Sequence, residues 1–281
     1  MPARALLNGE PAPASAFDDR ACHFGDGLFE TIAIRKGQPA LWDWHWERLQ
    51  LGCQRLGLGP PSATLLEQEV QYLCNGLERG ILKIVLGAGK ANAGYVRDPQ
   101  APPTRWLRAS AWPDAHPWAT TIPLTVVSCR LRLASQPRLA GIKHLNRLEQ
   151  VLARAELPEG VDEGILCDRE GRVIEAISAN LLVRMGERWI TPPLTECGVA
   201  GTVRRQLLER GPALGIRVAE DAFDLDELRS ADAIYLTNAL LGIRPVARID
   251  DRELPAPVRD EKLEILHRSC FTFSGELSCK E

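Results

Sequence analysis

Lys143 is the residue of this chain whose neighbours in the sequence best suit covalent chemistry. It stands in the run Gly-Ile-Lys-His-Leu-Asn-Arg-Leu-Glu-Gln at residues 141–150. Apolar residues at 3-4-3 spacing accompany it, namely Leu145, Leu148, Leu152 and Ala155. This spacing predicts an amphipathic helix directly after the lysine. A partly desolvated lysine loses its proton more readily and attacks carbonyl carbons, although most lysines are solvated surface charges.

Glu175 is a candidate partner for a cationic group. Residues 173–183 predict one strand, whose alternate side chains share a face. Those side chains are Val173, Glu175, Ile177, Ala179, Leu181 and Val183. Glu175 is the one charge in this apolar row, and a buried carboxylate needs a cation or hydrogen-bond donors. A glutamate at a strand end that reaches water explains the pattern equally well.

Three further features suit an anion such as phosphate. A glycine-flanked loop at residues 198–201 precedes a predicted helix, whose first N–H groups and positive dipole end favour negative charge. The run Thr-Asn-Ala at residues 237–239 follows a predicted buried strand. Arg48 lies at the edge of a helix stripe, where its guanidinium could reach a phosphate. Plain connecting loops and solvated helix arginines are the commoner cases.

The run Gly-Ala-Gly-Lys at residues 87–90 fits neither nucleotide-binding motif. A P-loop needs a glycine where Ile84 stands and serine or threonine where Ala91 stands. The dinucleotide motif needs a third glycine where Asn92 stands. Both interpretations are rejected.

Composition excludes several classes of protein. The chain has 281 residues, 45% of them hydrophobic and 25% charged, and a formal net charge of −3. This charge disfavours a nucleic-acid binder. The absence of a signal-like N-terminus or a long apolar run predicts a cytoplasmic protein that does not enter a membrane. The eight cysteines and five histidines are scattered, so we expect free thiols and no metal site.

The predicted elements alternate between strand and helix in the first half. Expected there are strands at 31–34 and 81–86, a helix at 43–55, and a helix from Thr64, capped with Glu67. Expected later are a hairpin of 165–167 with 173–183, a helix from 202, a strand at 233–236 and a helix at 258–268. We therefore predict an α/β protein with a smaller N-terminal domain (1–113), a linker (114–122), a larger C-terminal domain (123–270) and a tail (271–281).

A lysine, an isolated carboxylate, an arginine and amide-rich turns are the groups that bind pyridoxal 5'-phosphate. The chain resembles the fold-type IV pyridoxal-phosphate enzymes and, within that group, the 4-amino-4-deoxychorismate lyases. The matching segments are residues 24–31, 45–49, 141–154, Glu175 with 178–181, and 198–204. Aminotransferases of the group typically diverge directly after the lysine.

The resemblance implies a homodimer of fold-type IV architecture with the cofactor in the cleft between the two domains. Lys143 would form the Schiff base, Glu175 would face the pyridine nitrogen, and Thr31 would assist proton transfer. The residues implied for the phosphate are Arg48, Thr202, Val203, Asn238 and Ala239. The implied reaction converts 4-amino-4-deoxychorismate into 4-aminobenzoate and pyruvate, a step toward folate.

The chain departs from the family where substrate carboxylates would be bound. Ala88 and Ala93 stand where the family usually carries arginines. Lys90 and Arg97 are the nearby cations that could substitute for them.

Three alternatives stay open. One is an aminotransferase acting on D- or branched-chain amino acids, and another is a non-catalytic binder on the same fold. The third is a nucleic-acid module, disfavoured by the acidic net charge, that would use Arg138, Lys143, Arg147 and Arg154.

Overall fold

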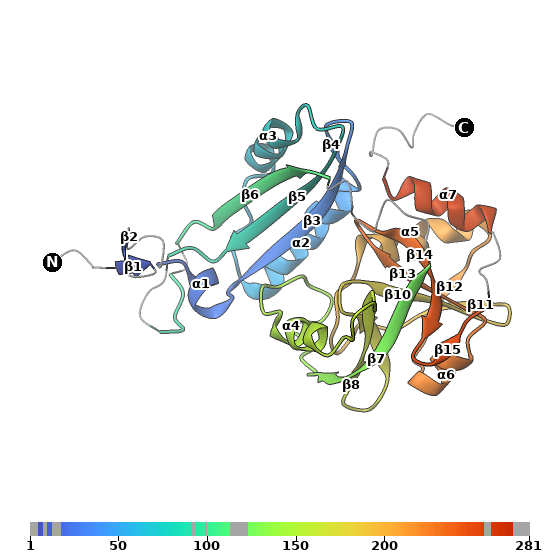
Figure 1. Cartoon of the computed structure of the whole chain (residues 1–281). Coiled ribbons are helices and arrows are strands. Elements are labelled where there is room, and N and C mark those ends of the chain that lie inside the picture. The colour runs from blue at the N-terminus through green and yellow to red at the C-terminus, as the bar shows by residue number, and fades with distance from the viewer. Residues whose placement is uncertain are drawn as a thin grey trace.

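The computed structural model describes residues 18–90, 94–98, 100–112, 123–255 and 260–271, together with the backbone of the short hairpin β1 (Ala5–Leu7) and β2 (Glu10–Ala12). Two larger sheets dominate these residues, and they lie side by side in Figure 1. This mixed architecture confirms the predicted α/β fold class. None of the helices in these ranges is long and apolar enough to cross a membrane.

The first sheet has four antiparallel strands in the order β4-β3-β5-β6. These are β3 (Gly27–Arg35), β4 (Gln38–Pro39), β5 (Arg79–Gly87) and β6 (Thr104–Ala111), preceded by helix α1 (Arg20–Phe24). Ile32 and Ile34 of β3 face helices α2 (Trp42–Leu56) and α3 (Ala63–Cys74) in one core. Because side chains alternate along a strand, Phe29 and Thr31 point to the opposite face.

The second sheet has nine strands in the order β12-β11-β10-β13-β14-β7-β8-β9, with β15 paired to β14. Its strands are β7 (Leu124–Leu133), β8 (Glu163–Asp168), β9 (Val173–Ala176), β10 (Asn180–Met185), β11 (Arg188–Thr191), β12 (Val218–Glu220), β13 (Ala233–Asn238), β14 (Gly242–Ile249) and β15 (Arg252–Glu253). The associated helices are α4 (Leu148–Ala155), α5 (Thr202–Arg210), η3 (Gly211–Leu214), α6 (Leu225–Ser230) and α7 (Glu261–Ser269).

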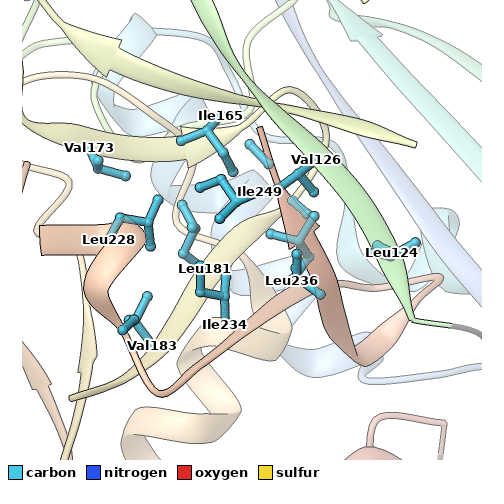
Figure 2. Close-up of a cluster of buried hydrophobic side chains, with 14 of the residues drawn as sticks. Leu124, Val126, Ile165, Val173, Leu181, Val183, Leu228, Ile234, Leu236 and Ile249 are labelled. Carbon is cyan, nitrogen blue, oxygen red and sulfur yellow. The ribbon is translucent and has the colours of Figure 1, made fainter. Parts of the chain in front are cut away.

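The central strand β10 of the second sheet is buried on both faces. Figure 2 shows one core, in which Leu181 and Val183 of β10 meet Ile165, Leu228 and Ile234. The intervening Leu182 of β10 packs on the other face, in the core that contains α5 and α7. A strand that is buried on both faces reads as a continuous apolar run, and Leu-Leu-Val at residues 181–183 fits this rule.

The chain around Lys143 is hydrogen-bonded to both halves of the molecule. The Phe29 N–H of β3 donates to the Lys143 carbonyl at 2.9 Å, and the Leu145 N–H donates to the Gly27 carbonyl at 2.9 Å. On the other side, the Gly141 N–H donates to the Gly198 carbonyl at 2.8 Å. Residues 141–145 are therefore a connection outside the named helices and strands, and the helix begins only at Leu148.

Two predictions about local structure were wrong. The strand expected over residues 173–183 is two strands, β9 and β10, because the Ala176 N–H donates to the Ala179 carbonyl at 2.7 Å and the chain then changes partners. Alternate side chains of residues 173–183 therefore do not all share one face of a single strand. Helix α3 is capped by Ser62, whose hydroxyl accepts from the Leu65 N–H, and not by Thr64.

The apolar residues that predicted an amphipathic helix after Lys143 do not face the core. Leu148 and Leu152 of α4 are 75% and 60% exposed, and Ala153 is the buried residue of this helix. The predicted linker at 114–122, residues 272–281 of the predicted tail, and Ala93 lie outside the described residues. The division into domains stays a prediction, and we propose it because the two sheets lie on either side of that linker in the sequence.

Candidate active site

A cavity of about 530 Å³ lies between the two sheets, beside the connection that carries Lys143. Its wall includes most of the residues predicted for a site: Thr31, Arg48, Lys143, Glu175, Thr202, Asn238 and Ala239. Their positions in the sequence span more than two hundred residues, so the fold brings them together. A concave site with several convergent polar groups is the usual form of a small-molecule site.

Lys143 is set up to lose its proton. Burial, reinforced by the positive charge of Arg48, lowers the pKa of Lys143 to about 8. Its Nζ lies 4.3 Å from the centre of the Phe29 ring. A lysine with this pKa is partly neutral near pH 7, which is the form that attacks carbonyl carbons or takes up a proton.

Glu175 is 4% exposed, so the alternative in which its side chain reaches water is wrong. Burial raises the pKa of Glu175 to about 7, while the Val199 N–H and the charges of Arg147 and Lys143 oppose that shift. The Val199 N–H donates to Oε2 at 2.8 Å. A carboxyl group in this state becomes fully ionised when another cationic or N–H group approaches it.

Arg48 is held by a buried carboxylate that the sequence reasoning missed. Its Nε and Nη2 donate to the two oxygens of Glu30 at 2.8 and 2.5 Å, and His45 Nδ1 lies 2.7 Å from Glu30 Oε2. Burial opposes ionisation, yet the charges of Arg48 and His45 lower the pKa of Glu30 to about 2. The sequence pattern could have identified Glu30. It alternates with Leu28 and Ile32 as the one charge in an apolar row, which is the pattern that selected Glu175.

The start of α5 offers free backbone N–H groups. Gly201 is the N-cap, and no side chain of the described residues caps this helix, so the amides of Thr202 and Val203 have no acceptor within it. The side chain of Val203 packs in the core, which leaves its amide alone to reach a ligand. Arg48 Nη1 donates to the Ala200 carbonyl at 2.8 Å, so the arginine and the helix start adjoin.

The turn after β13 is built by Asn238 itself. Its Oδ1 accepts from the N–H groups of Leu240 and Leu241 at 2.9 and 2.7 Å, and its Nδ2 donates to the Ser178 carbonyl. The side chain is therefore committed to the turn, and Asn238 and Ala239 line the cavity. The neighbouring Thr237, which belongs to the run at 237–239 already selected from the sequence, is 1% exposed, and its Oγ1 has no partner among the described residues.

Lys90 and Arg97 are not brought to the cavity wall. Lys90 lies 3.8 Å from Asp18 near the surface, and Arg97 is paired with Asp26, its Nε donating at 2.8 Å. Two other arginines, Arg147 and Arg154, do line the wall. The sequence reasoning had placed them in a nucleic-acid alternative only.

Residues 27–249 match the family described as amino-transferase class IV. The chain belongs to this family. The 4-amino-4-deoxychorismate lyase from Pseudomonas aeruginosa, a crystal structure, is 40% identical with a TM-score of 0.83, covering 94% of this chain and 97% of that one. The aminodeoxychorismate lyase of Vibrio harveyi is 34% identical, covering 88% of this chain and 92% of the relative.

A more distantly related structure supports the fold of this chain, and only the fold. A hypothetical aminotransferase from Mycobacterium tuberculosis in its PLP-bound form is 22% identical with a TM-score of 0.78, covering 95% of this chain and 98% of that one. The resemblance to fold-type IV enzymes seen in the sequence is thus confirmed.

The substitution Glu30→Gln tests the buried ion pair. Removing the charge leaves the Arg48 guanidinium without its partner, so we expect the free energy of unfolding at pH 7 to fall by about 3–5 kcal/mol. The pKa of Glu30 is depressed, so its contribution is present above the ordinary value of 4.5 and is lost as pH falls toward about 2. Urea titrations across this pH range measure both effects.

Glu47→Gln is the matched control, since Glu47 pairs with Arg205 in a half-exposed ion pair. We expect a change below about 1 kcal/mol there. Equal losses in the two variants, or a Glu30→Gln loss that does not shrink below pH 4.5, would contradict the assignment.

Proposed function

We propose that this protein is a 4-amino-4-deoxychorismate lyase, which converts 4-amino-4-deoxychorismate into 4-aminobenzoate and pyruvate. The observation that carries the proposal is the half-buried Lys143, with its lowered pKa, on the cavity wall and inside the run at residues 141–150 that resembles the lyases. Two relatives above 30% identity carry this name, and the matches to them cover most of the chain. The small-molecule substrate fits a cavity of about 530 Å³.

The residues of the cavity fit pyridoxal 5'-phosphate, the cofactor that we assign to it. Lys143 would attach the cofactor, and Glu175 would accept a hydrogen bond from the pyridine N–H. The uncapped start of α5 supports a phosphate there, as does the buried Thr237 Oγ1, which no described group partners. The residues that would hold the phosphate are Arg48, Thr202, Val203, Asn238 and Ala239. When bound, this group withdraws electrons from the substrate carbon that carries the amine.

The reaction needs one proton removed and one bond broken. Lys143 Nζ, once free, takes the proton from C4, the ring carbon that bears the amine. The bond between C3 and the enolpyruvyl oxygen then breaks with its electron pair on the oxygen, and the departing enolate gains a proton on its methylene carbon to become pyruvate. The ring is left aromatic as 4-aminobenzoate. Thr31, on the same wall as Lys143, is positioned by β3 to pass a proton through its hydroxyl.

We also propose a homodimer, in which α4 lies at the interface. Leu148 and Leu152 are 75% and 60% exposed, and they lie one turn apart on this helix, outside the cavity wall. Adjacent exposed aliphatic side chains of this kind mark association surfaces. We further propose a cytoplasmic location, which is supported by the described cysteines being free thiols.

The central test supplies 4-amino-4-deoxychorismate to the purified holoenzyme and measures both products. We expect equal amounts of 4-aminobenzoate and pyruvate. Lys143→Ala should lower turnover by about 10³-fold or more because the base is lost, with an unchanged circular dichroism spectrum. Lys83→Ala, at an exposed lysine of β5, is the control that keeps full activity.

Two results would point to the alternatives. Rapid half-transamination of D- or branched-chain amino acids without pyruvate release would indicate an aminotransferase. A purified protein that gains no visible absorbance with pyridoxal 5'-phosphate would indicate a non-catalytic binder. Full activity in Lys143→Ala would make the lysine assignment wrong.

Glu175→Gln should retain bound cofactor, seen by its visible absorbance, but lose about 10²-fold in turnover. The neutral amide cannot hold the proton on the pyridine nitrogen, so the ring accepts electrons less well. Glu187→Gln, at an exposed position between β10 and β11, should change neither property. Unchanged turnover in Glu175→Gln would remove this role.

The double substitution Leu148→Glu with Leu152→Glu tests the interface. Charges on these two positions of α4 should convert the dimer into monomers, measured by analytical ultracentrifugation. Tyr72→Glu, at an exposed aromatic residue of α3, is the control that stays dimeric. A wild-type protein that sediments as a monomer at micromolar concentration would contradict the dimer.

A further inference from the structure

Two arginines of the cavity wall lack an anionic partner. Neither Arg147 nor Arg154 has a carboxylate within 4.0 Å among the residues that the structure describes, whereas Arg48 is neutralised by Glu30 at 2.5 Å. Arg147 Nε donates to the His144 carbonyl at 2.8 Å, and its Nη2 lies 3.4 Å from the Ile142 carbonyl. Arg154 donates through Nη1 to the Asp162 carbonyl at 2.6 Å. Both guanidinium groups keep further N–H donors for a ligand.

The positive charge of Arg147 is partly desolvated, which costs free energy in the absence of a carboxylate partner among the described residues. Burial lowers the pKa of Arg147, and the negative charge of Glu175 compensates only in part. Glu175 is the one acidic side chain among the described residues of the wall, which therefore carries an excess of positive charge. A desolvated cation without a partner is a strong site for an anionic ligand.

Both arginines belong to the side of α4 that faces the cavity. Arg147 is the N-cap, and the wall continues with Gln150, Val151 and Arg154, at spacings of three, four and seven residues. Residues at these spacings share one helix face, and seven residues correspond to about 10 Å along the axis. Arg147 is the inner cation, since its charge acts on both Lys143 and Glu175. Arg154 is the outer, exposed one.

The proposed substrate has two carboxylates that match this arrangement. Its amine must reach the position of Lys143 Nζ. The enolpyruvyl carboxylate is attached next to the amine-bearing carbon, and the ring carboxylate lies across the ring from the amine. We infer that Arg147 binds the enolpyruvyl carboxylate and that Arg154 binds the ring carboxylate, an inference that rests on the proposed lyase function.

This assignment accounts for the departure of the chain from its family. Ala88, where the family usually carries arginine, is 7% exposed and offers no charge, and Lys90 and Arg97 lie away from the wall. The phosphate of the cofactor has its own donors at Arg48 and the start of α5, so it does not require α4. Arg147 and Arg154 thus remain for the substrate.

The roles of the two arginines can be tested separately with the two products as inhibitors, because each product keeps one of the two substrate carboxylates. Arg154→Gln should weaken inhibition of the holoenzyme by 4-aminobenzoate about tenfold or more, and leave inhibition by pyruvate unchanged. Arg147→Gln should weaken inhibition by pyruvate and leave that by 4-aminobenzoate unchanged. Arg154→Gln should also raise KM for 4-amino-4-deoxychorismate with little change in kcat, since that carboxylate is distant from the reacting bond.

Three controls test whether the loss of affinity in Arg154→Gln comes from a disturbed structure and not from the lost cation. Arg154→Lys should restore part of the affinity for 4-aminobenzoate, because a cation is again present. Aniline, which lacks the carboxylate, should inhibit wild type and Arg154→Gln equally. Arg138→Gln, at an exposed arginine outside the cavity wall, should behave as wild type.

The outcomes distinguish this inference from the proposed function. A wild-type enzyme that releases both products, with unchanged KM and unchanged product inhibition in Arg147→Gln and Arg154→Gln, overturns the inference alone. A loss of affinity for aniline as large as that for 4-aminobenzoate in Arg154→Gln also overturns it. A wild-type enzyme that releases neither product overturns the lyase function and the carboxylate assignment with it.

Discussion

The backbone hydrogen bonds on both sides of Lys143 are the constraint on which the rest of the structure depends. The Lys143 carbonyl accepts from β3 of the first sheet, and the Gly141 N–H donates to the loop before α5. The lysine is therefore fixed by backbone groups from both halves, and its side chain is free to enter the cavity between them. Because both halves surround it, burial lowers the pKa of Lys143, which makes the amine reactive near neutral pH.

A second connection between the halves runs through buried charges. Glu30 of β3 holds Arg48 and His45 of α2, Arg48 reaches the Ala200 carbonyl, and His45 Nε2 lies 3.4 Å from Thr202 Oγ1 at the start of α5. A carboxylate on this strand is tolerated because two cationic or hydrogen-bonding partners satisfy both of its oxygens. The arginine is thus pre-oriented toward the helix start before any ligand arrives, which reduces the cost of ordering it on binding.

The sequence was most informative where a pattern reflects local physics. The long helix α2, the strands β3 and β5 of the first sheet and the helix starting at Thr202 follow from periodicity and turn residues. It failed where tertiary contacts decide. The break between β9 and β10 depends on a change of strand partner, and the exposure of Leu148 depends on what surrounds α4. Neither is encoded in the spacing of apolar residues.

The candidate site shows the same division. Lys143, Arg48 and Glu175 could be selected from the sequence together with a family resemblance, since each has a residue type that the chemistry requires. Glu30 carried the same signal as Glu175, an isolated charge in an apolar row, but its partners lie on another element. The directions of Arg147 and Arg154 toward one cavity depend on where α4 packs. A helical spacing shows that two residues share a face, but only the fold shows what that face meets, and here it meets the space beside Lys143.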